Sequence, residues 1–198
     1  MRFRTLSLSG SVIAVALVLA GCTGTGGSMP GMDMGSGDTS SSTSAPSSTT
    51  AKTADEMFVT MMIPHHEQAI AMSDAILKKT GIDPKVTALA KQIKAAQAPE
   101  IQTMQAWLKD KGTSADSAPM TGMGMMSDHD MTTLDSATGS DAARLFLSGM
   151  IAHHEGAIEM ARSELSDGKD ADMRALAQKV VDGQTAEITT MKDILGSL

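Results

Sequence analysis

The chain has 198 residues, which is enough for one ordinary domain with appendages. Its aromatic content is only 2%, which argues against a β-sandwich or β-barrel core and favours helices built from Ala, Leu, Ile and Met. The formal net charge of −7 argues against a nucleic-acid partner, because phosphate binding needs clustered Lys and Arg.

The first 21 residues have the pattern of an export signal. Two arginines precede an apolar run, residues 11–20, which is shorter than the roughly 20 residues needed to cross a bilayer. The run ends in Leu-Ala-Gly-Cys, which resembles a bacterial lipobox, so we predict that residues 1–21 are removed and Cys22 is lipidated. The chain would then be anchored to the cell membrane on its extracytoplasmic or periplasmic side. A plain secretory signal with an incidental cysteine is the alternative.

Residues 22–54 read as a flexible tether of Gly, Ser, Thr and Pro, with too few large apolar residues to fold. Three methionines at positions 29, 32 and 34 have no core to fill there, so either metal capture or chance accounts for them. Cys22 is the only cysteine, and we therefore expect neither a disulfide nor a thiolate metal ligand.

The motif Met-Ile-x-His-His-Glu-x-Ala-Ile-x-Met occurs at residues 62–72 and again, 88 positions later, at residues 150–160. At about 100° per residue, both histidines of each copy border the apolar stripe of a helix, whereas the glutamate points to its edge or beyond. The four histidines are His65, His66, His153 and His154.

Helical patterns cover residues 55–79, 84–111, 140–167 and 170–195. Gln97 and Glu100 lie on the inward face of the second helix, and Gln184 and Glu187 repeat them on the fourth. Two duplicated hairpins, 55–111 and 140–198, predict an antiparallel four-helix bundle over residues 55–198. A pseudo-two-fold axis would bring the two His-His-Glu runs together.

The connector between the hairpins, residues 112–139, is unusually rich in sulfur. It has one larger aliphatic residue, Leu134, so a packing role for its many thioethers is hard to support. The candidate ligands in this segment are Met120, Met123, Met125, Met126, His129 and Met131.

The inward histidines have two interpretations. They could form a buried hydrogen-bond network with Glu and Gln that fixes the register of the bundle. Four imidazoles in two adjacent pairs would each need a partner, however, and this favours a metal or ligand role for at least one pair. The pattern leaves open whether they form one site or two.

The donor types select the metal. Imidazole suits zinc, copper, iron and nickel, while thioether favours soft ions, chiefly Cu(I). Copper is therefore expected, Cu(I) on the methionine clusters and Cu(II) on the histidines with nearby carboxylates, with silver on the same methionines. The metal-ligand candidates in the repeats are the four histidines with Glu67, Glu155, Met62 and Met150, although core packing is the default role of the last two.

The duplicated motif, with Gln-x-x-Glu-Ile-x-x-Met on the following helices, resembles the domain of unknown function 305 family from about Asp55 to Leu198. The resemblance implies a ferritin-like bundle in exported bacterial proteins, some of which bind copper and are linked to copper and silver tolerance. The family's histidine pairs correspond to His65, His66, His153 and His154, and its methionine segment to residues 120–126.

The sequence therefore predicts an exported lipoprotein that binds copper for sequestration, tolerance or transfer. No catalytic constellation is present, and the zinc-protease pattern His-Glu-x-x-His and the di-iron pattern Glu-x-x-His are absent. A metal-dependent redox enzyme and a metal-free helical adaptor with a polar core are the alternatives. The expected partners are a membrane, through Cys22, and a metal ion; no transfer partner or oligomeric state can be assigned.

Overall fold

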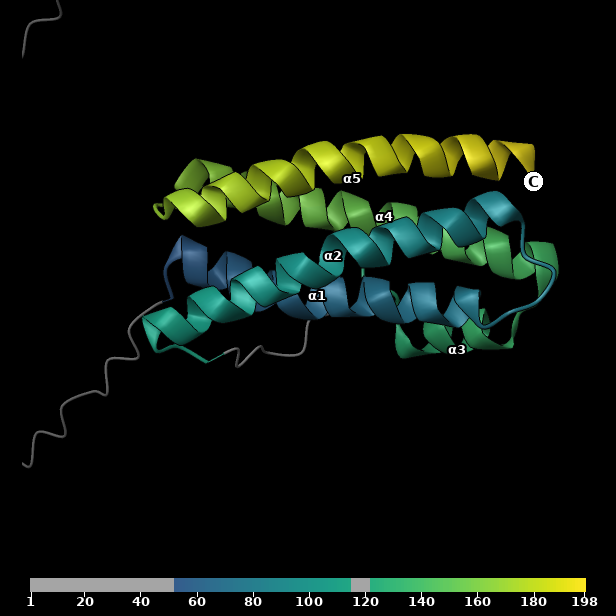
Figure 1. Cartoon of the computed structure of the whole chain (residues 1–198), viewed down its shortest axis with the longest axis horizontal. Helices are drawn as coiled ribbons and strands as arrows, with labels where there is room; N and C mark the ends of the chain where they lie inside the picture. The colour runs from purple at the N-terminus through teal and green to yellow at the C-terminus, as the bar shows by residue number, and fades with distance from the viewer. Residues whose placement is uncertain (1–51, 115–121) are drawn as a thin grey trace, which may run out of the picture. The chain divides into compact units, whose positions relative to one another are not determined.

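Five helices hold most of the residues that the computed structural model describes, which are 52–114 and 122–198 (Figure 1). The helices are α1 (Ala54–Leu77), α2 (Pro84–Lys111), α3 (Asp128–Ser136), α4 (Gly139–Asp167) and α5 (Ala171–Ser197). No strand occurs within these two ranges, and the all-α helical-bundle class expected from the sequence is confirmed. The signal, Cys22, the tether methionines and Met120 lie outside the described residues.

Local sequence signals set the ends of the helices. Thr53 starts α1 with a capping box, in which its hydroxyl accepts from the backbone of Glu56 at 3.1 Å and the Glu56 carboxylate accepts from the Thr53 backbone at 2.9 Å. Gly112 ends α2 with a φ of 65°, a conformation that glycine adopts without steric cost. Helix α1 runs past Pro64 without ending there, so the histidines lie in its middle.

The connector contains a helix that the sequence pattern did not indicate. Ser127 and Asp130 form a capping box at the start of α3, and Leu134 is its one fully buried residue. The polar composition of this short helix hides the usual apolar periodicity, because only Leu134 is fully buried and Met131 is partly buried against the bundle.

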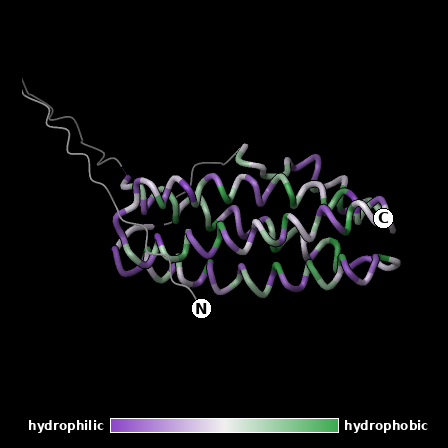
Figure 2. The backbone as a smooth tube through the Cα atoms, turned by 90° about the horizontal axis from the view of Figure 1, so that it is seen from above, coloured by the Kyte–Doolittle hydropathy of each residue, from purple (hydrophilic) through white to green (hydrophobic). Residues whose placement is uncertain are grey.

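The helices pair as two hairpins. Helix α1 packs against α2 and α4 against α5, while α1 also packs along α4; α2 and α5 make few contacts with each other. Figure 2 shows polar and apolar stretches alternating along each helix, as expected for elements with one buried face. Within the part of the chain described, no helix is long and apolar enough to be a membrane span.

The apolar core is divided into two clusters. One holds Phe58 to Ile63 of α1 with the last part of α2 and the first part of α5, and the other holds Ala69 to Ile76 with the opposite ends of those helices. In each long helix the boundary between the clusters is occupied by buried His, Gln or Glu. A polar layer therefore crosses the middle of the bundle.

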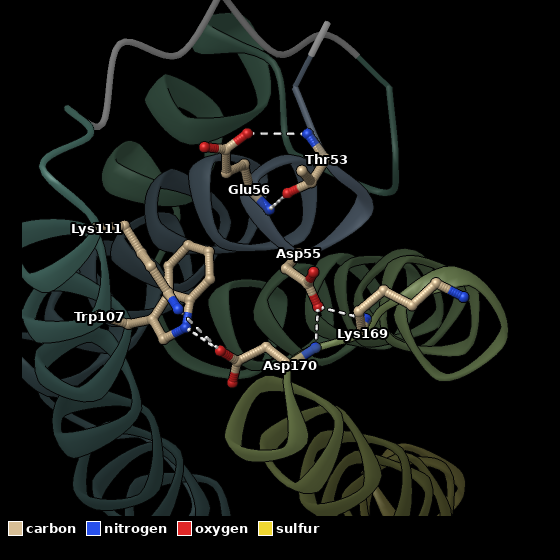
Figure 3. A pocket seen from close by; sticks show the side chains of 7 residues that line it. All are labelled: Thr53, Asp55, Glu56, Trp107, Lys111, Lys169 and Asp170. Atoms are coloured by element: carbon tan, nitrogen blue, oxygen red, sulfur yellow. Dashed lines mark hydrogen bonds and ion pairs between the residues drawn. The ribbon is translucent and has the colours of Figure 1, made fainter.

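One end of the bundle is tied by a carboxylate network (Figure 3). Asp55 at the start of α1 accepts hydrogen bonds from the backbone N–H groups of Lys169 and Asp170, both at 2.8 Å. Asp170 in turn accepts from the indole N–H of Trp107 at 2.9 Å, and Lys111 lies 3.4 Å from its carboxylate. The network joins the starts of α1 and α5 to the end of α2.

Candidate metal centre

The polar layer contains all four paired histidines, and every one of them is fully buried. The rings of His65 and His153 are in contact across the α1–α4 interface, with centroids 3.7 Å apart and planes tilted by 38° to each other. The ring of His154 is centred 6.3 Å from that of His153. The two copies of the motif are thus brought together in the centre of the bundle.

Two glutamates bind the outer histidines. The Nε2 of His66 lies 2.8 Å from the carboxylate of Glu100, and the Nε2 of His154 lies 2.8 Å from that of Glu187. A carboxylate accepts, so each Nε2 carries the proton and donates. In a neutral imidazole that carries its proton on Nε2, the second ring nitrogen, Nδ1, keeps a lone pair.

The connector binds a third histidine. The carbonyl of Met123 lies 2.9 Å from Nε2 of His65, which therefore also donates through Nε2 and keeps a lone pair on Nδ1. Gln68, one turn further along α1, holds the same segment by donating to the carbonyl of Met126 and accepting from its N–H, both at 2.8 Å.

Several buried polar atoms in the layer have no hydrogen-bond partner. They are Nδ1 of His65, His66 and His154, both ring nitrogens of His153, and both amide atoms of Gln97 and Gln184. Each buried, unsatisfied polar group costs about 1–3 kcal/mol, and native proteins keep few of them without a reason. A bound ion or ordered water would satisfy these atoms.

Burial keeps the central pair neutral. Desolvation lowers the pKa of His65 to about 4, although its hydrogen bond to Met123 acts in the opposite direction. Desolvation, followed by the neighbouring His65 and His154, holds the pKa of His153 well below its usual 6.5. Neutral imidazole is the form that ligates metals.

Two glycines let the connector reach the layer. A Cβ on Gly156 would lie 1.7 Å from the carbonyl oxygen of Met123, and a Cβ on Gly124 would lie 1.9 Å from the carbonyl oxygen of Ala152. The connector backbone therefore lies directly on α4 beside the second histidine pair.

The structure does not bring every predicted ligand to the layer. Glu67 and Glu155 are exposed, and Glu155 lies 3.6 Å from Lys192 instead of beside a histidine. Met62 and Met150 are fully buried in opposite apolar clusters, where they pack. For the two glutamates the reason is rotation, since one residue further along a helix turns the side chain by about 100° and out of the layer, whereas the two methionines lie about one helical turn before the histidines.

The connector residues are spread over different surroundings. The His129 side chain is 89% exposed and lies beside Asp130, 3.7 Å away, at the start of α3. Met131 and Met126 are partly buried against one apolar cluster, whereas Met123 is 37% exposed. Met125 lines a surface pocket on α4 with Met126.

Two contributions were missed in the sequence. The inward position of Glu100 and Glu187, and their place in a possible hydrogen-bond network with the histidines, follow from the sequence, but their pairing with His66 and His154 does not. Gln68 and Gly156 occupy equivalent positions in the two copies of the motif, and this departure from the repeat marked where the connector crosses. The described residues contain no group of three or more His, Cys, Asp or Glu side chains arranged to hold a metal ion.

The comparisons with known proteins agree on one family. The family model DUF305, a domain of unknown function, matches residues 55–195. A DUF305 fragment from Deinococcus radiodurans is 31% identical, with a TM-score of 0.68, and the match covers 73% of this chain and 97% of that one. A DUF305 protein of Streptomyces coelicolor with a secreted-protein assignment is 31% identical, with a TM-score of 0.69, covering 73% and 92%.

A third similar structure is CopM, which has been solved in Cu(I)-bound, Cu(II)-bound and silver-bound forms. The Cu(I)-bound form is 28% identical to this chain, with a TM-score of 0.62, and the match covers 72% of this chain and 96% of CopM. No curated protein matches this chain in sequence.

Proposed function

This chain belongs to the DUF305 family, and we propose that it is an exported, lipid-anchored protein that binds copper in order to sequester or transfer it. Metal is held and passed on in this proposal, without chemical turnover. Cys22 would carry the lipid, and residues 22–54 would tether the bundle to the membrane. The secreted relative and the metal-bound forms of CopM support this direction.

The observation that carries the proposal is the set of bare imidazole nitrogens. His65, His66 and His154 each donate through Nε2 to an oxygen acceptor, and their Nδ1 atoms are buried and unpartnered. A histidine whose other nitrogen donates to a carboxylate or carbonyl is in the tautomer and orientation that a metal ligand needs. Glu100 and Glu187 are then positioning residues for the imidazoles.

The donor set favours copper over zinc. Imidazoles in the layer and thioethers elsewhere in the chain suit copper, with Cu(I) preferring sulfur and Cu(II) preferring nitrogen and oxygen. Silver, as a soft ion, would compete for the same thioethers.

A groove between α2 and α5 reaches Glu100, which binds a histidine of the layer. It has a volume of about 630 Å³, and its charged lining residues are Glu100, Asp110, Asp172 and Lys179. Because Glu100 also holds His66, a cation entering this acidic groove would meet a carboxylate that is one hydrogen bond away from an imidazole.

The test is an anaerobic Cu(I) competition titration and an aerobic Cu(II) titration followed by electron paramagnetic resonance. A variant with His65→Leu and His153→Leu removes the central pair while keeping the layer filled. It should lose the nitrogen-ligated Cu(II) signal, whereas His129→Ala, which removes an exposed histidine, should keep it. Equal Cu(II) binding by all three proteins would refute the histidine site.

The metal-free adaptor is the second candidate. The two His–Glu hydrogen bonds of 2.8 Å are what a purely structural polar core would also contain. Under that reading the protein would bind copper no more tightly than a methionine-poor helical control. A redox enzyme would in addition oxidise a reductant or peroxide steadily once loaded with metal.

Membrane attachment is tested separately. Cys22→Ser should release the protein from the membrane fraction and abolish incorporation of labelled palmitate. Release without any loss of palmitate would contradict the lipidation at this residue.

A further inference from the structure

A second group of thioethers lies away from the histidine layer. A pocket of about 320 Å³ between the first turns of α1 and the last turns of α4 is lined by Met57, Met61, Met123 and Met160. Two of the four come from α1, one from α4 and one from the connector. Nothing in the repeat pattern grouped these side chains, because three of them lie outside the Met-rich segment.

Packing does not explain the two outer methionines. Met57 is 47% exposed and Met123 is 37% exposed, and both rank among the most exposed large apolar side chains of residues 52–114 and 122–198. An exposed thioether stabilises a fold little, because hydrophobic stabilisation scales with the apolar area removed from water. Met160, in contrast, is 4% exposed and forms the floor of the pocket.

The internal repeat provides a comparison within the same molecule. The positions in α4 that correspond to Met57 and Met61, at the same offset of 88, are Leu145 and Gly149. The same helical surface therefore forms in the second hairpin without a thioether at either position. The two methionines are a property of this pocket and are not required by the bundle.

The backbone of Met123 is held in a strained conformation. Its φ of 51° is the only positive value of a non-glycine residue among the described residues, and it lies in the left-handed region that costs an L-residue roughly 1–2 kcal/mol. The contact with Gly156 and the hydrogen bond from His65 fix this turn. The strained turn is part of the pocket lining.

The pocket is also suited to a positive charge. Glu159 and Asp167 line it beside the methionines, and the whole chain is acidic. Neutral sulfur donors with carboxylates nearby favour a soft cation over an apolar ligand of similar volume.

We propose that Met57, Met61, Met123 and Met160 form a thioether site for a soft monovalent cation, Cu(I) or Ag(I), separate from the histidine layer. The proposal rests on the proposed function only for its choice of copper as the natural ion. Met123 connects the two sites, since it lines the pocket and its carbonyl accepts from His65. Binding of a cation in the pocket should therefore change the environment of the His65 ring.

The experiment is a titration of the purified protein with Ag(I), followed by the methyl resonances of ¹³C-labelled methionine. The test variant carries Met57→Leu, Met61→Leu and Met160→Leu, which are swaps of similar volume that keep the pocket apolar. The matched control is Met72→Leu, which changes a fully buried methionine of α1 in the other apolar cluster.

We expect the methyl signals of Met57 and Met61 to shift at the first equivalents of Ag(I), together with the ring signals of His65. The test variant should bind at least one equivalent fewer than the wild type, and the control should match the wild type. Unshifted Met57 and Met61 signals at stoichiometric Ag(I) would overturn the site even if the triple variant failed to fold.

The two proposals fail in different ways. Unchanged Ag(I) binding by the triple variant, with nitrogen-ligated Cu(II) lost in the His65→Leu and His153→Leu variant, would overturn the thioether site and leave the proposed function standing. If Ag(I) bound only in the pocket and the histidines bound no copper, the histidine site would be overturned and the thioether site would stand.

Discussion

Replacing Gly156 by alanine tests the contact between the connector and α4. The new Cβ would lie 1.7 Å from the carbonyl oxygen of Met123, whereas ordinary contacts begin at 3.4 Å. The nearest atoms, the carbonyl of Met123 and the nitrogen of Gly124, belong to the connector backbone, so they cannot turn away as a flexible side chain would. The connector must therefore retreat by about 1.7 Å.

That displacement can be converted into a free energy of unfolding. It would lengthen the 2.9 Å hydrogen bond from His65 to Met123 beyond bonding distance, and it would pull the two 2.8 Å bonds between Gln68 and Met126 out of register. Three bonds at about 1 kcal/mol each give about 3 kcal/mol. Alanine is better than glycine in a helix by about 1 kcal/mol, so the net destabilisation is about 2 kcal/mol.

The assay is urea unfolding combined with hydrogen exchange at the Met126 amide. Gly183→Ala is the control, because a Cβ on this exposed glycine of α5 meets nothing within 4 Å and should stabilise the helix by up to about 1 kcal/mol. A Gly156→Ala protein that is as stable as the wild type, with its Met126 amide still protected, would refute the close packing of the connector.

Three further predictions concern groups that can be changed singly. Glu187→Ala should destabilise the protein more than Glu100→Ala in urea unfolding. The Glu187 side chain is 10% exposed and that of Glu100 is 21% exposed, so water can more easily replace the lost Glu100 carboxylate. Equal losses in the free energy of unfolding would contradict this. Burial raises the pKa of Glu164 from 4.5 to about 8, so the folded state keeps a proton that the unfolded chain releases, and stability should fall as pH rises through this range. Glu164→Gln should remove that fall, and urea midpoints at pH 5 and pH 8.5 that change as in the wild type would count against it. Gln68→Ala should speed hydrogen exchange at the Met126 amide and leave the α-helical circular dichroism unchanged. An unaltered exchange rate would show that the two hydrogen bonds between Gln68 and Met126 are not formed.

The inward position of the histidines could be predicted because it depends on local periodicity. His65 and His66 border the apolar stripe of α1 whatever packs against it, and the duplication placed the second pair in the same way. The same reasoning placed Gln97 and Glu100 on the inward face of α2. Helix pairing then brought these residues into one layer.

The choice of carboxylate and the course of the connector could not be predicted in this way. Glu67 follows His66 directly in the sequence, yet Glu100 on another helix is the residue that binds it, because contact depends on the rotation and register of two helices. Gly156 has no periodic signature at all. Its role appears only once the connector backbone is known to lie against it.

The division of the histidine layer between two similar hairpins has a consequence for how such a protein could arise. A single hairpin of this kind would carry one histidine pair, one glutamine and one glutamate, which is half of the layer. Two copies related by a two-fold axis would complete it as a homodimer, in which each copy contributes the same surface to the interface. When the two copies are joined in one chain, the equivalent positions 68 and 156 can hold different residues. Gln68 then binds the connector and Gly156 leaves room for it, whereas a symmetric dimer would have the same residue at both positions.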